Sequence, residues 1–173
     1  NNGQQNILSG EGNIGSMMAG GQYIQNGKGN IATMNGGVQG IYNGATGVID
    51  VLSTEAEATS NGGYQYIYTN GTGHIKDMQA GAQYVDGGSA IIEKMSNGTQ
   101  VVLNNANAQI KEMINGAQMV SAGSANIGVM TNGQQQILAD ATGTIEQMNG
   151  GSQIVNGTGS IKDMQDGVQY VDG

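Results

Sequence analysis

The stretch GYQYIYTNGTGHIKDM, residues Gly63–Met78, contains the unit that the rest of the chain repeats. Its first half reads Gly63-x-Gln65-x-Ile67, its second half reads Gly73-x-Ile75-x-x-Met78, and an Asn-Gly-Thr-Gly stretch separates them. Residues two apart lie on the same face of a β-strand. The stretch therefore predicts two short strands joined by a corner.

The same unit recurs along the whole chain. Gly-x-Gln-x-Ile/Val occurs ten times, with its glutamine at Gln5, Gln22, Gln39, Gln65, Gln83, Gln100, Gln118, Gln135, Gln153 and Gln169. The second half-unit occurs nine times, with Met closing eight copies and Leu52 closing one. Self-similarity at a short fixed period is the signature of a repeat architecture.

Two all-β architectures fit a period of 16–18 residues with Asn-Gly corners. A meander would place neighbouring segments antiparallel, with an Asn-Gly turn at each tip. A parallel β-solenoid would instead stack each unit on the same unit one turn later. The near-identical inward residues favour the solenoid, of about ten coils, because stacking places like on like. We expect one domain over residues 1–173, with a surface loop inserted near residues 53–60.

Charged residues give an internal test of this stacking. A parallel register places Lys76 under Glu93 under Lys111, with opposite charges facing each other about 4.8 Å apart. It likewise places Asp77 under Lys94 under a further acidic residue, Glu112. The glutamines should form a ladder in which each amide donates and accepts along the column, because an unpaired buried amide costs about 1–3 kcal/mol.

Composition limits the classes of partner. The chain has five Lys, no Arg, thirteen acidic residues and a net charge of −8, so it lacks a basic surface for nucleic acid. No apolar run is long enough for a transmembrane helix, and we expect no membrane insertion of this segment. The chain begins at Asn1 without an initiator Met, and we expect it to be a piece of a longer array.

Catalytic chemistry finds little support in the sequence. His74 stands alone and is expected to be an exposed surface residue, and no Cys is available as a nucleophile or thiolate ligand. Right-handed β-helices often carry polysaccharide-cleaving sites, but these need clustered carboxylates. Here the carboxylates lie beside or above lysines, so we expect no enzyme, no catalytic residue, no metal and no cofactor.

Tyrosines occupy outward positions of the predicted strands. They form an apolar strip on a face that is expected to be solvent-exposed. The β-propensity of tyrosine explains such a strip as well as an interaction surface does. The candidate interaction residues are Tyr23, Tyr64, Tyr66, Tyr68, Tyr84 and Tyr170.

The recurrent Gly-Gly-x-Gln-x-Ile/Val pattern, as in Gly150–Gly159, resembles the repeats of AIDA-type self-associating autotransporter passengers. The likeness covers nearly the whole chain, although the period is shorter and Ile-x-x-Met replaces the family's usual Thr and Val. The resemblance implies a right-handed β-helix on a bacterial outer-membrane surface or in the extracellular space. It also implies adhesion or self-association, through like molecules or a host-surface or glycan ligand. The alternative is a fibre subunit whose uncapped ends stack end to end.

Overall fold

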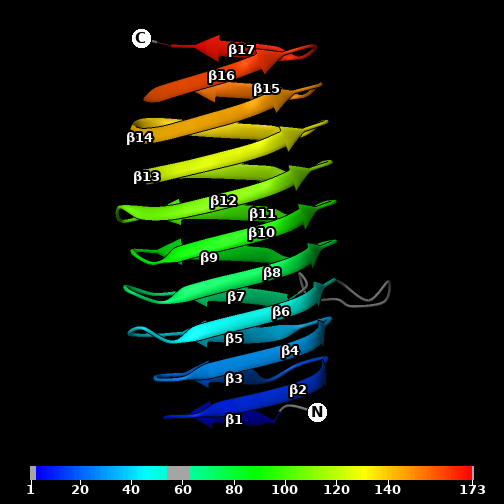
Figure 1. Ribbon diagram of the computed structural model, residues 1–173, viewed down its shortest axis with the longest axis vertical. Coiled ribbons are helices and arrows are strands. Elements are labelled where there is room, and N and C mark those ends of the chain that lie inside the picture. The colour runs from blue at the N-terminus through cyan, green and yellow to red at the C-terminus, as the bar shows by residue number, and fades with distance from the viewer. Residues whose placement is uncertain (1–2, 54–62, 173) are drawn as a thin grey trace.

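The computed structural model describes residues 3–53 and 63–172. Seventeen β-strands and no helix make up this part of the chain, and they wind into a single coil (Figure 1). The strands in front rise from left to right as the chain ascends, so the coil is right-handed (Figure 1). The predicted parallel β-solenoid is therefore confirmed.

The coil is flattened and has two faces, which we name by their buried residues. The Gln face consists of β1 (Gln4–Ile7), β3 (Gly21–Ile24), β5 (Gly37–Ile41), β7 (Gly63–Ile67), β9 (Ala82–Asp86), β11 (Thr99–Leu103), β15 (Ser152–Val155) and β17 (Val168–Val171). The Met face consists of β2 (Glu11–Met17), β4 (Lys28–Met34), β6 (Thr46–Leu52), β8 (Thr72–Met78), β10 (Ser89–Met95), β12 (Ala106–Met113) and β16 (Thr158–Met164). Strands β13 (Ala117–Met130) and β14 (Gln134–Met148) run through the corner and contribute to both faces.

Every strand pairs in parallel with its counterpart one coil away, in the register that the repeat predicts. In the central coils Gln65 pairs with Gln83, and Ile75 pairs with Ile92. Ten strands carry the glutamine half-unit and nine carry the isoleucine half-unit, which gives nine complete turns and the start of a tenth. The number of half-units therefore predicts the number of coils, although β13 and β14 each carry two half-units in one long strand.

The tight corner that precedes each glutamine depends on glycine. The glycine two residues before Gln has a positive φ in eight coils, for example +110° at Gly116 and +100° at Gly133. These glycines also stack, and a Cβ on Gly116 would come within 2.7 Å of the carbonyl oxygen of Gly98. Both the backbone conformation and the space exclude a side chain here, which explains why the sequence repeats glycine at this point.

Two buried columns fill the interior. The column against the Gln face consists of Ile and Val with small alanines, from Ile7 to Val155, and the column against the Met face consists of Ile, Met and Leu52. Most of these side chains are fully buried, including Ile67, Ile75 and Met78. Apolar stacking of this kind supplies the main stabilisation of the fold.

The stack continues across the position of the predicted insertion. Strand β7 pairs with β5, and β8 pairs with β6, with no loss of register. Ser53 still belongs to the described chain, where its N–H donates to Met34 O at 2.9 Å. The rest of the predicted loop at residues 53–60 lies outside the described residues.

Candidate functional site

The ten glutamines form one hydrogen-bonded column inside the coil. Each Nε2 donates to Oε1 of the glutamine one coil earlier, for example Gln100 to Gln83 at 2.7 Å and Gln118 to Gln100 at 2.6 Å. Nine such bonds link Gln5 to Gln169 without a gap. The eight glutamines from Gln22 to Gln153 are fully buried, so the column satisfies amides that would otherwise be costly.

The column has a direction, because every amide donates toward the N-terminal end. In four coils the second amide hydrogen also has an acceptor, as when Gln65 Nε2 donates to Gly47 O at 3.3 Å. Among the described residues, Gln5 Nε2 and Gln169 Oε1 have no bond along the column. The glutamine amides of the interior therefore bond to one another, and they serve the fold rather than a ligand.

Outside the same face lies a cluster of tyrosines. The rings of Tyr66 and Tyr84 stack one coil apart, with centroids 4.7 Å apart and planes 7° from parallel. Tyr64 tilts against both rings at 6.2 and 6.3 Å. All three side chains are half-buried. We call these three residues the tyrosine cluster; it lies over β7 and β9.

A second stacked pair involves a tyrosine that the sequence analysis missed. Tyr42 stacks on Tyr68 with centroids 4.5 Å apart and planes 9° from parallel. Tyr42 follows β5 directly, just as Tyr68 follows β7. The matching position three residues after Gln39 and Gln65 was a sequence signal for this pair.

The other two candidate tyrosines lie apart from these stacks. Tyr23 pairs with Gly40, whose partner on the next coil is Tyr66, so the outward column is interrupted by one glycine. Tyr170 pairs with Ile154, is 59% exposed, and lies at the far end of the stack. Val101 and Met119 come between the cluster and that end. The predicted strip is therefore a compact patch near the middle, with outliers.

Stacking also affects ionisation of the phenols. Burial raises the pKa of Tyr66 above its ordinary value, and the neighbouring Tyr84, Tyr64 and Tyr68 raise it further. Burial, followed by Tyr68, raises the pKa of Tyr42 in the same way. These two phenols thus stay neutral hydrogen-bond donors to higher pH than a free tyrosine does.

A shallow hollow adjoins the tyrosine cluster. It is lined by Tyr64 and Tyr84, by Val101 and Met119, and by residues of the neighbouring corners and strand starts, including Asn97 and Thr99. Met119 is 37% exposed, and most of the lining surface of the hollow is apolar. Such a surface can stack flat groups or pack against another protein surface.

The predicted charge stack on the Met face is right in register and wrong in part of its pairing. Lys111 contacts Glu93 at 2.7 Å as expected. Lys76, however, pairs with Asp50 one coil earlier at 2.7 Å, while Glu93 Oε1 contacts His74 Nε2 at 2.9 Å. Glu93 therefore contacts His74 and Lys111, one with each carboxylate oxygen, and does not pair with Lys76.

The second predicted charge column forms no ion pair among the described residues. Asp77, Lys94 and Glu112 follow one another in register. Asp77 Oδ2 instead accepts from Gln79 Nε2 at 2.8 Å, while Asp77 Oδ1 is buried without a partner. Register alone therefore predicted neighbours but not contacts, since long side chains can lean toward either coil.

His74 is half-buried rather than exposed, and its contact with Glu93 corrects the expectation of an isolated surface histidine. The Glu93 carboxylate has a lowered pKa because Lys111 donates to it and His74 adds to the effect.

Within residues 3–53 and 63–172, no group of three or more His, Asp and Glu is placed to hold a metal ion. The described part of the chain also contains no helix long and apolar enough to cross a membrane.

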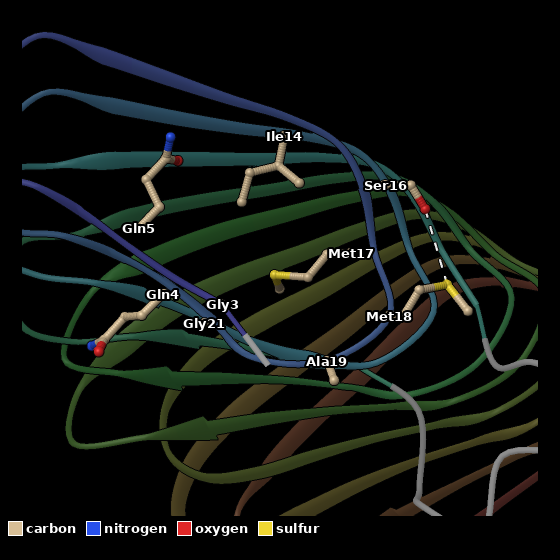
Figure 2. Close-up of a pocket in the computed structure, with 9 residues that line it drawn as sticks. All are labelled: Gly3, Gln4, Gln5, Ile14, Ser16, Met17, Met18, Ala19 and Gly21. Atoms are coloured by element: carbon tan, nitrogen blue, oxygen red, sulfur yellow. Dashed lines mark hydrogen bonds between the residues drawn. The ribbon is translucent and has the colours of Figure 1, made fainter. Parts of the chain in front are cut away.

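The N-terminal end of the described stack opens into the coil interior. Figure 2 shows Gln5, Ile14 and Met17 inside this opening, and Ser16 and Met18 at the outer corner. The hollow has a volume of about 460 Å³. Its inner lining repeats the residues that the following coils bury, so it has the chemistry of the core rather than that of a separate site.

Comparisons with known protein families, with curated proteins and with solved structures find no match to this chain.

Proposed function

We propose that this chain is a structural and adhesive repeat domain without catalytic activity or cofactor. It would mediate self-association or bind a host surface or glycan, as part of a protein secreted or displayed on a bacterial surface. The observation that carries the proposal is the tyrosine cluster. The interior satisfies its own polar groups, whereas Tyr64, Tyr66 and Tyr84 gather on the outside beside an apolar hollow.

The physical properties of the cluster suit a contact surface. Tyr66 and Tyr84 are already held against each other, so little side-chain entropy remains to be lost on binding. Tyrosine also combines a large apolar ring with a hydroxyl that remains hydrogen-bonded in a wet interface. A net charge of −8 opposes the approach of two such rods, so salt should strengthen lateral association.

The double variant Tyr66→Ser/Tyr84→Ser tests this proposal. We expect lower self-association in light scattering and weaker adhesion to cells or immobilised glycans. Ile154→Ser is the matched control, because Ile154 belongs to the same outward column and lies far from the cluster. Unchanged association in the double variant, or an equal loss in the control, would overturn the proposal.

The likeness to autotransporter passengers supports the proposed location. A coiled rod with no cysteine can cross an oxidising periplasm without forming disulfides. Surface location predicts that protease added to intact cells removes the domain. Protection of the domain in intact cells would contradict it. The full-length gene product offers a second check, because a C-terminal membrane barrel is expected after an array of this class.

A second candidate function, end-to-end assembly into fibres, is favoured by the ends of the described stack. Gln5 Nε2 and Gln169 Oε1 are a complementary donor and acceptor, and both end coils show core-type residues to solvent. Met164 is 44% exposed and Val171 is 70% exposed, whereas Met148 and Val155 are buried. Such open ends tend to pair with further strands.

Met164→Glu distinguishes the two candidates. It places a charge on the end of the coil and leaves the tyrosine cluster intact. Fibres that disappear in Met164→Glu and persist in Tyr66→Ser/Tyr84→Ser would support axial assembly over lateral contact. A chain that stays monomeric at high concentration would remove the case for axial assembly.

A further inference from the structure

The two stacked tyrosine pairs hold reactive ring carbons close together across neighbouring coils. Tyr66 and Tyr84 are direct register partners in β7 and β9, and their rings lie nearly parallel with centroids 4.7 Å apart. Tyr42 and Tyr68 are held in the same way at 4.5 Å. The backbone ladder also fixes this second pair, because Tyr68 N–H donates to Ile41 O and Tyr42 N–H donates to Ile24 O, each at 2.9 Å.

We propose that these pairs are sites of oxidative cross-linking, in which Tyr66 couples to Tyr84 and Tyr42 couples to Tyr68. The oxidant is hydrogen peroxide acting through a peroxidase-type one-electron catalyst. Each phenol loses its hydroxyl hydrogen as one electron and one proton, which leaves a radical with spin on the ring carbons next to the C–O carbon. Two such radicals form one carbon–carbon bond between those ring carbons.

The hydrogen on each coupled carbon then moves to the phenoxyl oxygen and restores the aromatic ring. In sum, two tyrosines and one hydrogen peroxide give one dityrosine and two water molecules. The protein loses two hydrogens for each cross-link. No other group of the protein is consumed.

The composition of the chain directs oxidation to tyrosine. The 173 residues contain no cysteine and no tryptophan, so neither a thiol nor an indole competes for the radical. Methionine is oxidised by oxygen transfer to a sulfoxide, which is a separate pathway. Most of the methionines, such as Met78 and Met95, are fully buried in the column against the Met face.

Each cross-link would join two coils covalently. The Tyr66–Tyr84 bond ties β7 to β9, and the Tyr42–Tyr68 bond ties the chain on either side of residues 54–62. A covalent tie between neighbouring coils restricts the unfolded chain and so raises stability, as a disulfide does in other proteins. A cysteine-free rod would thereby gain covalent reinforcement when it is exposed to peroxide.

The experiment treats the folded chain, at low concentration, with peroxidase and hydrogen peroxide, and maps the products after unfolding. Cleavage after Lys and Glu separates the partners, because Glu55 and Glu57 lie between Tyr42 and Tyr68, and Lys76 lies between Tyr66 and Tyr84. We expect dityrosine fluorescence, and a chain that carries both bonds should join three fragments in one species. Chains that carry a single bond should give two cross-linked species, each two hydrogens lighter than its parts. One joins fragments 58–76 and 77–93, and the other joins 29–55 and 58–76.

Conservative variants assign each bond without removing the stacked rings. Tyr66→Phe should abolish the first species and leave the second, whereas Tyr42→Phe should do the reverse. Tyr170→Phe is the control and should change neither. A chain unfolded in guanidinium should give scattered products that include Tyr23 and Tyr170. The proposal is overturned if the folded chain yields no dityrosine, yields only cross-links between molecules, or yields the same scatter as the unfolded chain.

Discussion

Gly73 lies directly against Ile67, so closely that a Cβ added to Gly73 would come within 2.5 Å of Ile67 Cγ1 and 2.7 Å of Gln65 Oε1. The same relationship holds in the other coils with Ile at this point. Three coils with valine show a compensation for it, because those with Val85, Val102 and Val120 carry alanine in place of the glycine, at Ala90, Ala108 and Ala125. The coil with Val155 is the exception and keeps glycine, at Gly159. One methylene removed from one strand makes room for one methyl on the next.

This pairing predicts a rescue. Gly73→Ala should destabilise the fold by about 1–3 kcal/mol, because it overpacks a filled interior. Ile67→Val alone should cost about 0.5–1.5 kcal/mol. The double variant should be more stable than the sum of the single effects predicts, as measured by denaturant unfolding in a double-mutant cycle. Strictly additive effects would contradict the proposed contact.

Breaking the glutamine column in the middle should lower the free energy of unfolding more than breaking it at its end. Gln100→Met removes a donor to Gln83 and an acceptor from Gln118, and leaves two buried amide groups unpaired. We expect a loss on the order of 2 kcal/mol or more. Gln169→Met is the matched control, because Gln169 is exposed and has only one partner along the column. Equal losses in the two variants, measured by thermal unfolding, would show that the column contributes nothing beyond packing.

The third prediction concerns the stability contribution of the glycines at the tight corner. Gly116 has a φ of +110°, and a Cβ there would meet Gly98 O and, at 2.8 Å, Met95 Cε. Gly116→Ala should therefore cost about 1–3 kcal/mol through backbone strain and crowding. Gly15→Ala is the control, because Gly15 has no atom within 4 Å of its added Cβ and no positive φ. The melting temperatures of the two variants should differ clearly, and a similar small shift in both would contradict the strain at the corner.

The fold was readable from sequence because each inward position repeats under the same constraint. Glutamine recurs where an amide must bond to its own kind, and glycine recurs where φ is positive. Side-chain contacts on the outside were less predictable. Lys76 had acidic neighbours in both adjoining coils, and register alone did not show that it would contact Asp50 while His74 contacts Glu93. Tyr42 was missed because it stands one residue beyond the repeat pattern, at the position that matches Tyr68 one coil later, on which it stacks.

The pH dependence of stability should show the Glu93 contacts. Lys111, and after it His74, lowers the pKa of the Glu93 carboxyl below the 4.5 of a free side chain. A lowered pKa in the folded state stabilises the fold above the unfolded value, and this contribution is lost as the pH falls through the folded value. Unfolding midpoints measured from pH 6 down to about pH 3 should therefore fall less in Glu93→Gln than in the parent chain.

Glu112→Gln is the control, since no ion pair of Glu112 occurs among residues 3–53 and 63–172, and it should retain the slope of the parent chain. The effect is expected to be small, because the Glu93 side chain is 37% exposed and solvent screens the pair. An identical acid slope in Glu93→Gln and the parent chain would mean that the Glu93–Lys111 contact does not contribute to stability.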